Sequence, residues 1–289
     1  MSSGILRNKW AVCIALTLLF SVLSLIVSAK DEKLKPEEIV NKNLAAIGTQ
    51  EDRAAVKSRI VSGTADVVFR LGGHGQMQGK GNMLSEGQKT RISMIFGGLD
   101  YPGEHLAYDG NKVTVGQVRP GERSTLSSFV YLQTTLLKEG LLGGTLSTAW
   151  ALLDAPGRQG RLDYNGLKKI EGKQLHEVKY KPKKGAGDLG IFLYFEPETF
   201  RHVRSQYRML QPPPMASTPT ESSGMRDTIY LLVEQFDDFK SFDGITLPQS
   251  YKISFTIEGM GRTFLADWLM KTGEVVHNQE IDPKYFVSQ

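Results

Sequence analysis

Apolar and polar positions alternate through much of the chain from residue 60 onward. In 60–70, the apolar residues Val61, Ala65 and Val67 lie four and two positions apart, so they share one face, as expected of a half-buried strand. Further strands are predicted at 77–84, 90–96, 105–108, 113–118, 161–164, 167–170, 175–180, 189–195, 201–210, 228–239, 246–257 and 263–274. The connections within each run are too short for crossover helices, so an antiparallel meander is predicted.

Two parts of the sequence have helical rather than strand periodicity. In 36–48, Pro36 suits the first turn, Gly48 suits the end, and Ile39, Leu44 and Ile47 share one stripe. The apolar stretch 124–153 also has helical spacing, and Gly143-Gly144 divides it, so 145–153 is predicted to be a second helix.

A sheet of about a dozen antiparallel strands curls instead of remaining flat. The apolar stretch 124–153 has to be buried, and the concave side of a curled sheet offers the place. The predicted fold is therefore mainly β: a single large curved antiparallel sheet, an open half-barrel, with helices packed in its concave face.

The first 29 residues have the order of a secretory signal peptide. Arg7 and Lys9 precede an apolar stretch, 10–27, and small residues up to Ala29 offer a cleavage site. The alternative is an uncleaved segment that anchors the protein in the inner membrane. Cleavage predicts a periplasmic chain of one domain, 30–289, with a mobile Pro/Ser/Thr-rich loop at 211–226.

Charge and cysteine content exclude several classes of function. The formal net charge is +4, and loss of the two basic residues of the signal lowers it to +2, without the basic patch of a nucleic-acid-binding protein. The single cysteine, Cys13, lies within the signal, so the mature chain has no disulfide, thiol nucleophile or cysteine-based zinc site.

The sequence contains no motif for catalysis, a metal or a cofactor. The five histidines are dispersed, which favours surface or capping positions over a metal site: His74, His105, His176, His202 and His277. A G-x-S-x-G elbow is missing, and the paired carboxylates at 37–38 and 237–238 occupy ordinary solvated positions. We therefore expect a protein that is not an enzyme, with no catalytic residue, metal or cofactor.

A series of short motifs resembles the LolA/LolB-like outer-membrane lipoprotein-sorting superfamily. They are the helix at 37–48, the "DGK"-type hairpin at 104–113, and the segments 193–200, 239–248 and 281–286. The resemblance implies an open half-barrel that holds acyl chains beneath helices. The stretch 86–90 lacks the family's "R-P-x-x-F". The resemblance therefore implies the fold and a hydrophobic cavity, but it does not identify the cargo.

Large apolar side chains are the best candidates for ligand contact, because they are predicted on the concave face and its helical lid. These residues are Met94, Phe96, Leu106, Tyr108, Phe129, Leu136, Trp150, Phe192, Tyr194, Tyr230, Phe255 and Trp268. Two functions stay open. One is a carrier for a lipid or a lipid-modified protein, in contact with membrane-associated envelope components. The other is a protein-interaction or envelope-sensing module whose cavity is filled by its own side chains.

Overall fold

The computed structural model describes residues 34–73, 75–213, 226–259 and 262–288. Residues Lys35–Gln289 form one compact unit. The predicted signal peptide at 1–29 and most of the predicted loop at 211–226 lie outside the described residues. Within those residues, no helix is both long enough and apolar enough to span a membrane.

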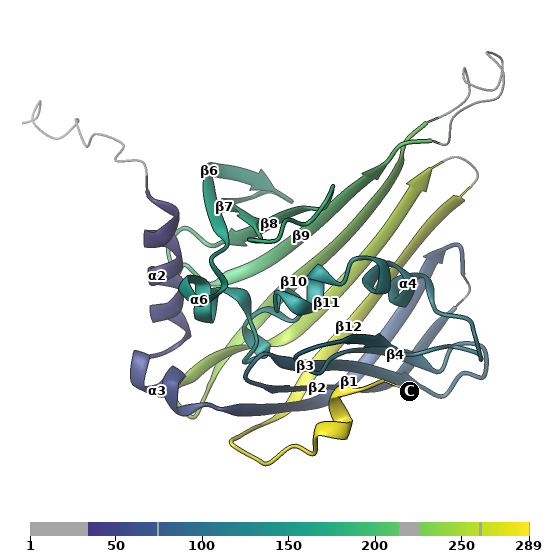
Figure 1. Cartoon of the computed structure of the whole chain (residues 1–289), viewed down its shortest axis with the longest axis horizontal. Helices are drawn as coiled ribbons and strands as arrows, with labels where there is room; N and C mark the ends of the chain where they lie inside the picture. Colours follow the sequence, from purple (N-terminus) through teal and green to yellow (C-terminus); the bar gives the residue numbers. More distant parts are fainter. Residues whose placement is uncertain (1–33, 74, 214–225, 260–261, 289) are drawn as a thin grey trace, which may run out of the picture. The chain divides into compact units, whose positions relative to one another are not determined.

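The described part of the chain forms one antiparallel sheet of twelve strands, which curves around the helices (Figure 1). The strands are β1 (Ser58–Leu71), β2 (Gln76–Glu86), β3 (Lys89–Phe96), β4 (Gly103–Tyr108), β5 (Val113–Val115), β6 (Arg161–Ile170), β7 (Lys173–Lys181), β8 (Gly190–Phe195), β9 (His202–Gln211), β10 (Thr228–Phe242), β11 (Ile245–Gly259) and β12 (Arg262–His277). This arrangement confirms the predicted open, mainly β half-barrel.

The sheet consists of two meanders joined side by side. Its strand order is β5-β4-β3-β2-β1-β12-β11-β10-β9-β8-β7-β6, so β1 pairs with the last strand of the chain. In this register Val67 lies opposite Trp268 and Ala65 lies opposite Met270. Strands β5 and β6 are the two edges and do not pair with each other, so the sheet remains open.

Most helical turns belong to the middle segment, which we define as residues 116–160, between β5 and β6. Its elements are α4 (Thr125–Leu132), α5 (Thr135–Lys138), the 3₁₀ turns η2 (Gly144–Leu146) and η3 (Ala151–Asp154), and α6 (Ala155–Arg158). Outside it lie α2 (Pro36–Ile47), α3 (Gln50–Ala55) and the 3₁₀ turn η4 (Pro283–Phe286).

The predicted helix at 145–153 is wrong, because two backbone N–H groups in this part of the middle segment bond to serine side chains in place of helical carbonyls. The backbone N–H of Thr148 donates to Ser85 Oγ of β2 at 2.9 Å. The N–H of Ala149 donates to Ser147 Oγ at 3.1 Å. Serine and threonine hydroxyls compete with helical bonds in this way, and two short 3₁₀ turns result.

Helix α2 forms as the sequence predicts and packs at one end of the sheet. Pro36 begins it, and the Glu38 carboxylate accepts a bond from the Lys35 backbone N–H at 3.2 Å. Its buried stripe contains Ile39, Val40 and Ile47 and packs near β6 and β11. The helix thus covers the end of the half-barrel at the left of Figure 1.

The main core lies between the concave face of the sheet and the middle segment. Fully buried sheet side chains that belong to this core include Met83, Ile92, Phe236, Phe255 and Trp268. Figure 1 shows α4 and the neighbouring turns lying within the curve of the strands. The chain therefore fills the space in which the sequence predicts a ligand.

Candidate functional site

Strand register assigns the predicted ligand residues to the two faces of the sheet. Seven of them point to the concave face: Met94, Phe96, Leu106, Tyr108, Tyr230, Phe255 and Trp268. Three more belong to the middle segment and are buried against that face: Phe129, Leu136 and Trp150. The structure thus brings ten of the twelve residues together.

Phe192 and Tyr194 lie on the convex face instead. In β8 the concave positions are taken by Leu193 and its neighbours two residues away, whereas Phe192 lies opposite Gln206 and Tyr194 opposite Arg204. Apolar side chains occupy both faces of this strand, so alternation alone did not show which set points inward. The two residues line a separate outer hollow of about 520 Å³.

The middle segment covers the concave face through aromatic contacts. The ring of Phe129 lies 4.9 Å from that of Phe255 and 5.8 Å from that of Tyr230. The indole of Trp150 stacks on His202 at 4.9 Å. Ring pairs at these distances add to the stabilisation that comes from burial. The middle segment is therefore packed as a core element.

A buried glutamate in β10 bonds the middle segment to the sheet. One carboxylate oxygen of Glu234 accepts bonds from the Gly143 backbone N–H at 2.7 Å and from the Tyr251 hydroxyl at 2.6 Å. The Tyr207 hydroxyl lies 2.6 Å from the other oxygen and 2.9 Å from the Leu141 carbonyl. Burial raises the pKa of Glu234 to about 7, although these bonds act in the opposite direction.

A second buried glutamate, Glu104 of β4, bonds the middle segment to the sheet near α4. It accepts bonds from the Ser127 hydroxyl at 2.5 Å and from the Tyr101 hydroxyl at 2.7 Å. The Tyr101 oxygen in turn accepts the indole N–H of Trp268 at 2.7 Å. Burial raises the pKa of Glu104 as well. One carboxylate therefore holds the start of the middle segment, and Glu234 holds its centre.

Neither glutamate is identified by a sequence motif, and two histidines lie deeper in the fold than their dispersed spacing predicts. Glu234 shares the concave face with Leu232 and Phe236, and this lone acid at an inward position is the signal that identifies it. His202 and His176 are buried, so the predicted surface positions are wrong for these two. Burial lowers the pKa of His202 to about 3 and keeps its ring neutral.

Two further hollows flank the packed centre. One, of about 450 Å³, lies where α3, the start of β1 and the turns η2 and η3 meet. The other, of about 430 Å³, lies between the outer face of β1–β3 and the C-terminal residues Ile281 and Tyr285.

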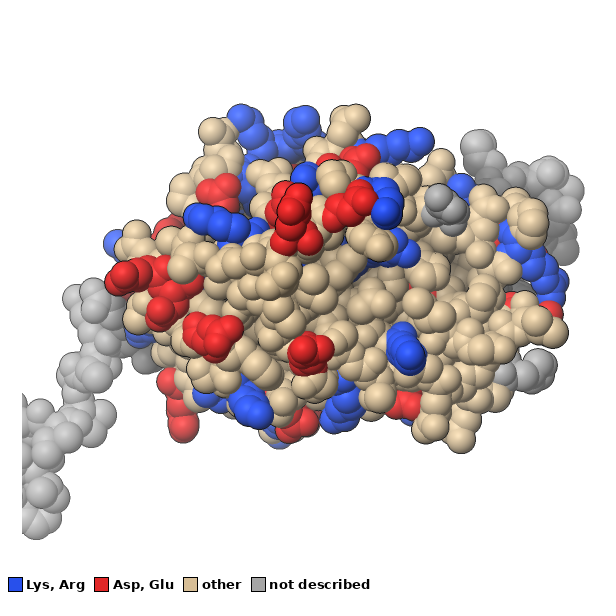
Figure 2. Space-filling model, turned by 90° about the horizontal axis from the view of Figure 1, so that it is seen from below, with Lys and Arg blue, Asp and Glu red and all other residues tan. Residues whose placement is uncertain are grey.

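Charged side chains are sparse across the middle of the molecular surface seen from below (Figure 2). Among the residues described, no group of His, Cys, Asp and Glu is arranged to hold a metal ion.

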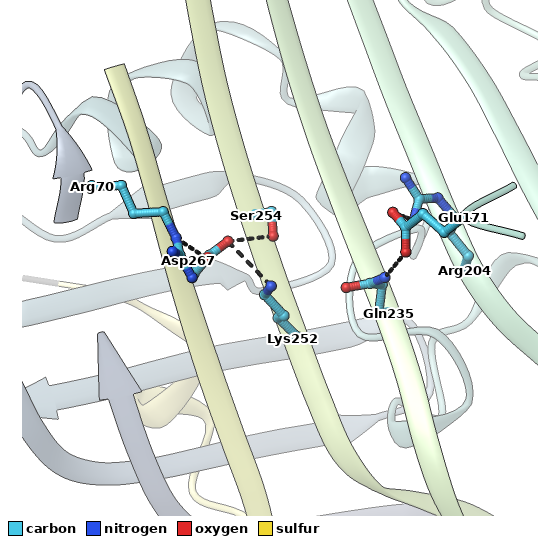
Figure 3. Close-up of polar contacts among 7 residues, drawn as sticks. All are labelled: Arg70, Glu171, Arg204, Gln235, Lys252, Ser254 and Asp267. Atoms are coloured by element: carbon cyan, nitrogen blue, oxygen red, sulfur yellow. Dashed lines mark hydrogen bonds and ion pairs between the residues drawn. The ribbon is translucent and has the colours of Figure 1, made fainter. Parts of the chain in front are cut away.

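The convex face carries ion pairs in place of buried acids (Figure 3). Asp267 accepts bonds from Arg70 at 2.7 Å and from Ser254 at 2.5 Å, and it lies 3.4 Å from the ammonium of Lys252. Beside them, Glu171 pairs with Arg204 at 2.8 Å. Asp267 thus links β12 to its neighbours β1 and β11, and Glu171 links the turn between β6 and β7 to β9.

Comparison with known proteins finds related folds but no close relative. No family model and no curated protein matches the sequence. A DUF1329 family protein from Desulfovibrio piger covers 88% of this chain and 98% of its own, with 12% identity and a TM-score of 0.46. A LolA superfamily protein from Nitrosomonas europaea covers 88% and 98%, with 11% identity and a TM-score of 0.45.

An outer-membrane lipoprotein-sorting protein domain from Vibrio parahaemolyticus gives similar values. It covers 86% of this chain and 97% of its own, with 12% identity and a TM-score of 0.43. The names of the last two structures are those of the LolA/LolB-like superfamily that the sequence resembles.

Proposed function

We propose that this protein is a non-catalytic binding protein of the cell envelope that carries a lipid or a lipid-modified protein. In this proposal the ligand lies against the apolar concave face, with Leu106, Phe255 and Trp268 in the wall. The middle segment is the cover, through Phe129 and Leu136, and moves aside when the ligand enters. The proposal includes export, with removal of residues 1–29 and a periplasmic location.

The observation that carries the proposal is the construction of the cover. It consists of short helical turns joined by glycines, and Gly143 has φ of 82° at the point where Glu234 holds it. A cover of short turns separates from a sheet more easily than one long helix does. Its removal exposes apolar wall at a cost of about 25 cal/mol per Å², and each buried CH₂ of an acyl chain offsets about 0.8 kcal/mol of that cost.

A second candidate is an interaction or sensing module with a permanently closed interior. It is favoured by the packing itself, because Leu106, Leu136 and Trp150 are fully buried by the chain's own residues. In this case the middle segment is a fixed part of the core, and partners bind elsewhere on the surface.

A disulfide staple between cover and sheet distinguishes the two candidates. The hydroxyl oxygens of Ser147 and Thr90 lie 3.4 Å apart, so Ser147→Cys with Thr90→Cys places two thiols within bonding reach. The chain from residue 30 onward contains no other cysteine. We expect the oxidised double variant to bind a fluorescent long-chain fatty acid at least tenfold more weakly than the same protein after reduction.

The two single-cysteine variants are the controls and should bind the probe as the wild type does with or without reductant. Equal binding by the oxidised and reduced double variant contradicts a movable cover. If the wild type binds no probe, and native mass spectrometry of the protein from its own cells detects no lipid, the carrier role is wrong and the module is the better description.

A further inference from the structure

The hollow of about 450 Å³ at the helical end has an unusual lining for an apolar half-barrel. Arg53 of α3, Arg59 of β1 and Arg158 of α6 all border it, and Asp154 is the only acid among the lining residues. We name it the arginine cavity. Its lining therefore carries two positive charges in excess.

None of the three arginines forms an ion pair with a carboxylate in the described parts of the chain. Their guanidinium groups bond mainly to backbone carbonyls. Arg59 donates to the Thr145 carbonyl at 2.6 Å, and Arg158 donates to the Ala149 carbonyl at 2.7 Å. Arg53 donates to the Leu44 carbonyl at 2.6 Å. Carbonyl groups orient these cations but carry no net charge, so the excess remains.

Burial makes this excess charge costly. Only 4% of Arg59 is exposed, and burial lowers its pKa to about 10. Burial also lowers the pKa of Arg53. A buried cation without an anionic partner loses hydration that carbonyl bonds replace only in part. An anion in the arginine cavity would offset that loss.

The same lining has hydrogen-bonding capacity to spare. Trp150 Nε1, Arg158 Nε, Thr145 Oγ1 and Thr148 Oγ1 are buried and have no partner among the described atoms. The indole and guanidinium nitrogens are donors only, so an acceptor alone can satisfy them. Their residues all border the arginine cavity. Unmatched donors beside unmatched positive charge favour a ligand rich in anionic oxygen.

We propose that the arginine cavity binds a phosphate monoester group. A monoester carries about −1.5 to −2 charges at neutral pH, which matches the excess of two, and its oxygens suit the fork of an arginine. The volume is within the usual range of small-ligand sites. The remaining wall includes Ile47, Val56 and Ile245, so the group is free phosphate or the head of an amphiphile. This proposal does not depend on the acyl site beneath the cover.

The test is calorimetric titration of the purified protein with inorganic phosphate, with short-chain phosphatidic acid, and with the matching diacylglycerol. Arg53→Gln and Arg158→Gln should each weaken binding of the phosphate-bearing probe at least about tenfold. Arg161→Gln is the matched control, because its side chain is 69% exposed on β6 and makes the same change in charge. It should leave binding unchanged.

The three probes separate the two sources of phosphate. Binding of inorganic phosphate identifies a site for the free anion. Binding of phosphatidic acid without binding of phosphate or diacylglycerol identifies a lipid headgroup. Arg53→Lys, which keeps the charge, should recover part of the affinity lost in Arg53→Gln if the variants remain folded by circular dichroism. Failure of both phosphate-bearing probes to bind, or equal loss in Arg161→Gln, overturns the proposal without affecting the staple experiment.

Discussion

The two faces of the sheet differ in the burial and the partners of their carboxylates. On the concave face, Glu234 and Glu104 are fully buried, and their described partners are hydroxyls and a backbone N–H. On the convex face, Asp267 lies between Arg70 and Lys252, and Glu171 pairs with Arg204, and each pair includes one side chain that is at least a third exposed (Figure 3). The same period-two alternation thus produces one desolvated network of carboxylates and hydroxyls and one network of ion pairs on the outer face.

This difference assigns the two networks different roles. A desolvated acceptor that loses a partner incurs the full cost of an unsatisfied buried group, about 1–3 kcal/mol. An exposed ion pair contributes about 0.2–1 kcal/mol and is screened by salt. The inner network therefore fixes the position of the middle segment, whereas the outer network adjusts the surface between strands.

The largest effect is expected from the aromatic core of the inner face. Phe236→Ala should lower the free energy of unfolding by about 3–5 kcal/mol, because the buried ring contacts His202 and Tyr251 and leaves a cavity. Phe192→Ala on the outer face should cost less, since its ring remains partly exposed. Urea unfolding midpoints measure both, and equal losses would contradict the contrast between the faces.

The next effect depends on pH. The unfolded carboxyl of Glu234 titrates near 4.5 and the folded one near 7, so the folded state binds the extra proton between these values. This group therefore stabilises the protein less as pH rises from about 4.5 to 7. The difference in melting temperature between Glu234→Gln and wild type should therefore shift in favour of the variant as pH rises through that range. Glu258→Gln, at an exposed position of β11, should show no such gain.

His202 opposes Glu234 over part of the same range. Its folded pKa of about 3 lies below the unfolded value of 6.5, so its contribution to stability is lost as pH falls below 6.5. Because the two effects have opposite signs, Glu234 and His202 together should change the wild-type melting temperature little between pH 5 and 6.5. Glu234→Gln should lose stability on acidification there. A parallel pH profile for variant and wild type would contradict the buried, protonated state of Glu234.

The smallest effect is expected on the outer face. Asp267→Asn removes the ion pairs with Arg70 and Lys252 but keeps an acceptor for Ser254. The loss should be about 0.2–1 kcal/mol for each ion pair and should shrink in 1 M NaCl. Thermal melts at low and high salt measure it. A loss as large as that of Phe236→Ala would show that the outer network is structural.

The strands and hairpins could be predicted because their signals are local. Alternation and Gly-containing turns identified every strand of the described sheet, with most ends within two or three residues of those observed, and the clearest error is the division of β6. There the chain was divided at 164–167, where the structure has a bulge with Gly166 at a φ of 84° and the strand continues. A bulge and a turn use the same glycine conformation, so the sequence does not separate them.

The features that could not be predicted depend on distant partners. Thr148 avoids a helix because Ser85, some sixty residues earlier, accepts its N–H. Glu234 resembles a solvated strand residue until Tyr207, Tyr251 and Gly143 are brought around it. The arginine cavity likewise collects side chains from four separate regions of the chain. Such groupings arise from tertiary structure and leave no periodic signal.

The pairing of β1 with β12 also constrains the order in which the strands can pair during folding. All other pairings between the described strands join strands adjacent in sequence, so each meander can grow hairpin by hairpin. Phe69 and Ala266 become neighbours only after a loop of nearly two hundred residues has closed. Closure of so long a loop slows folding. Until β1 and β12 pair, the sheet consists of two separate meanders, each with one more unpaired edge than in the folded protein.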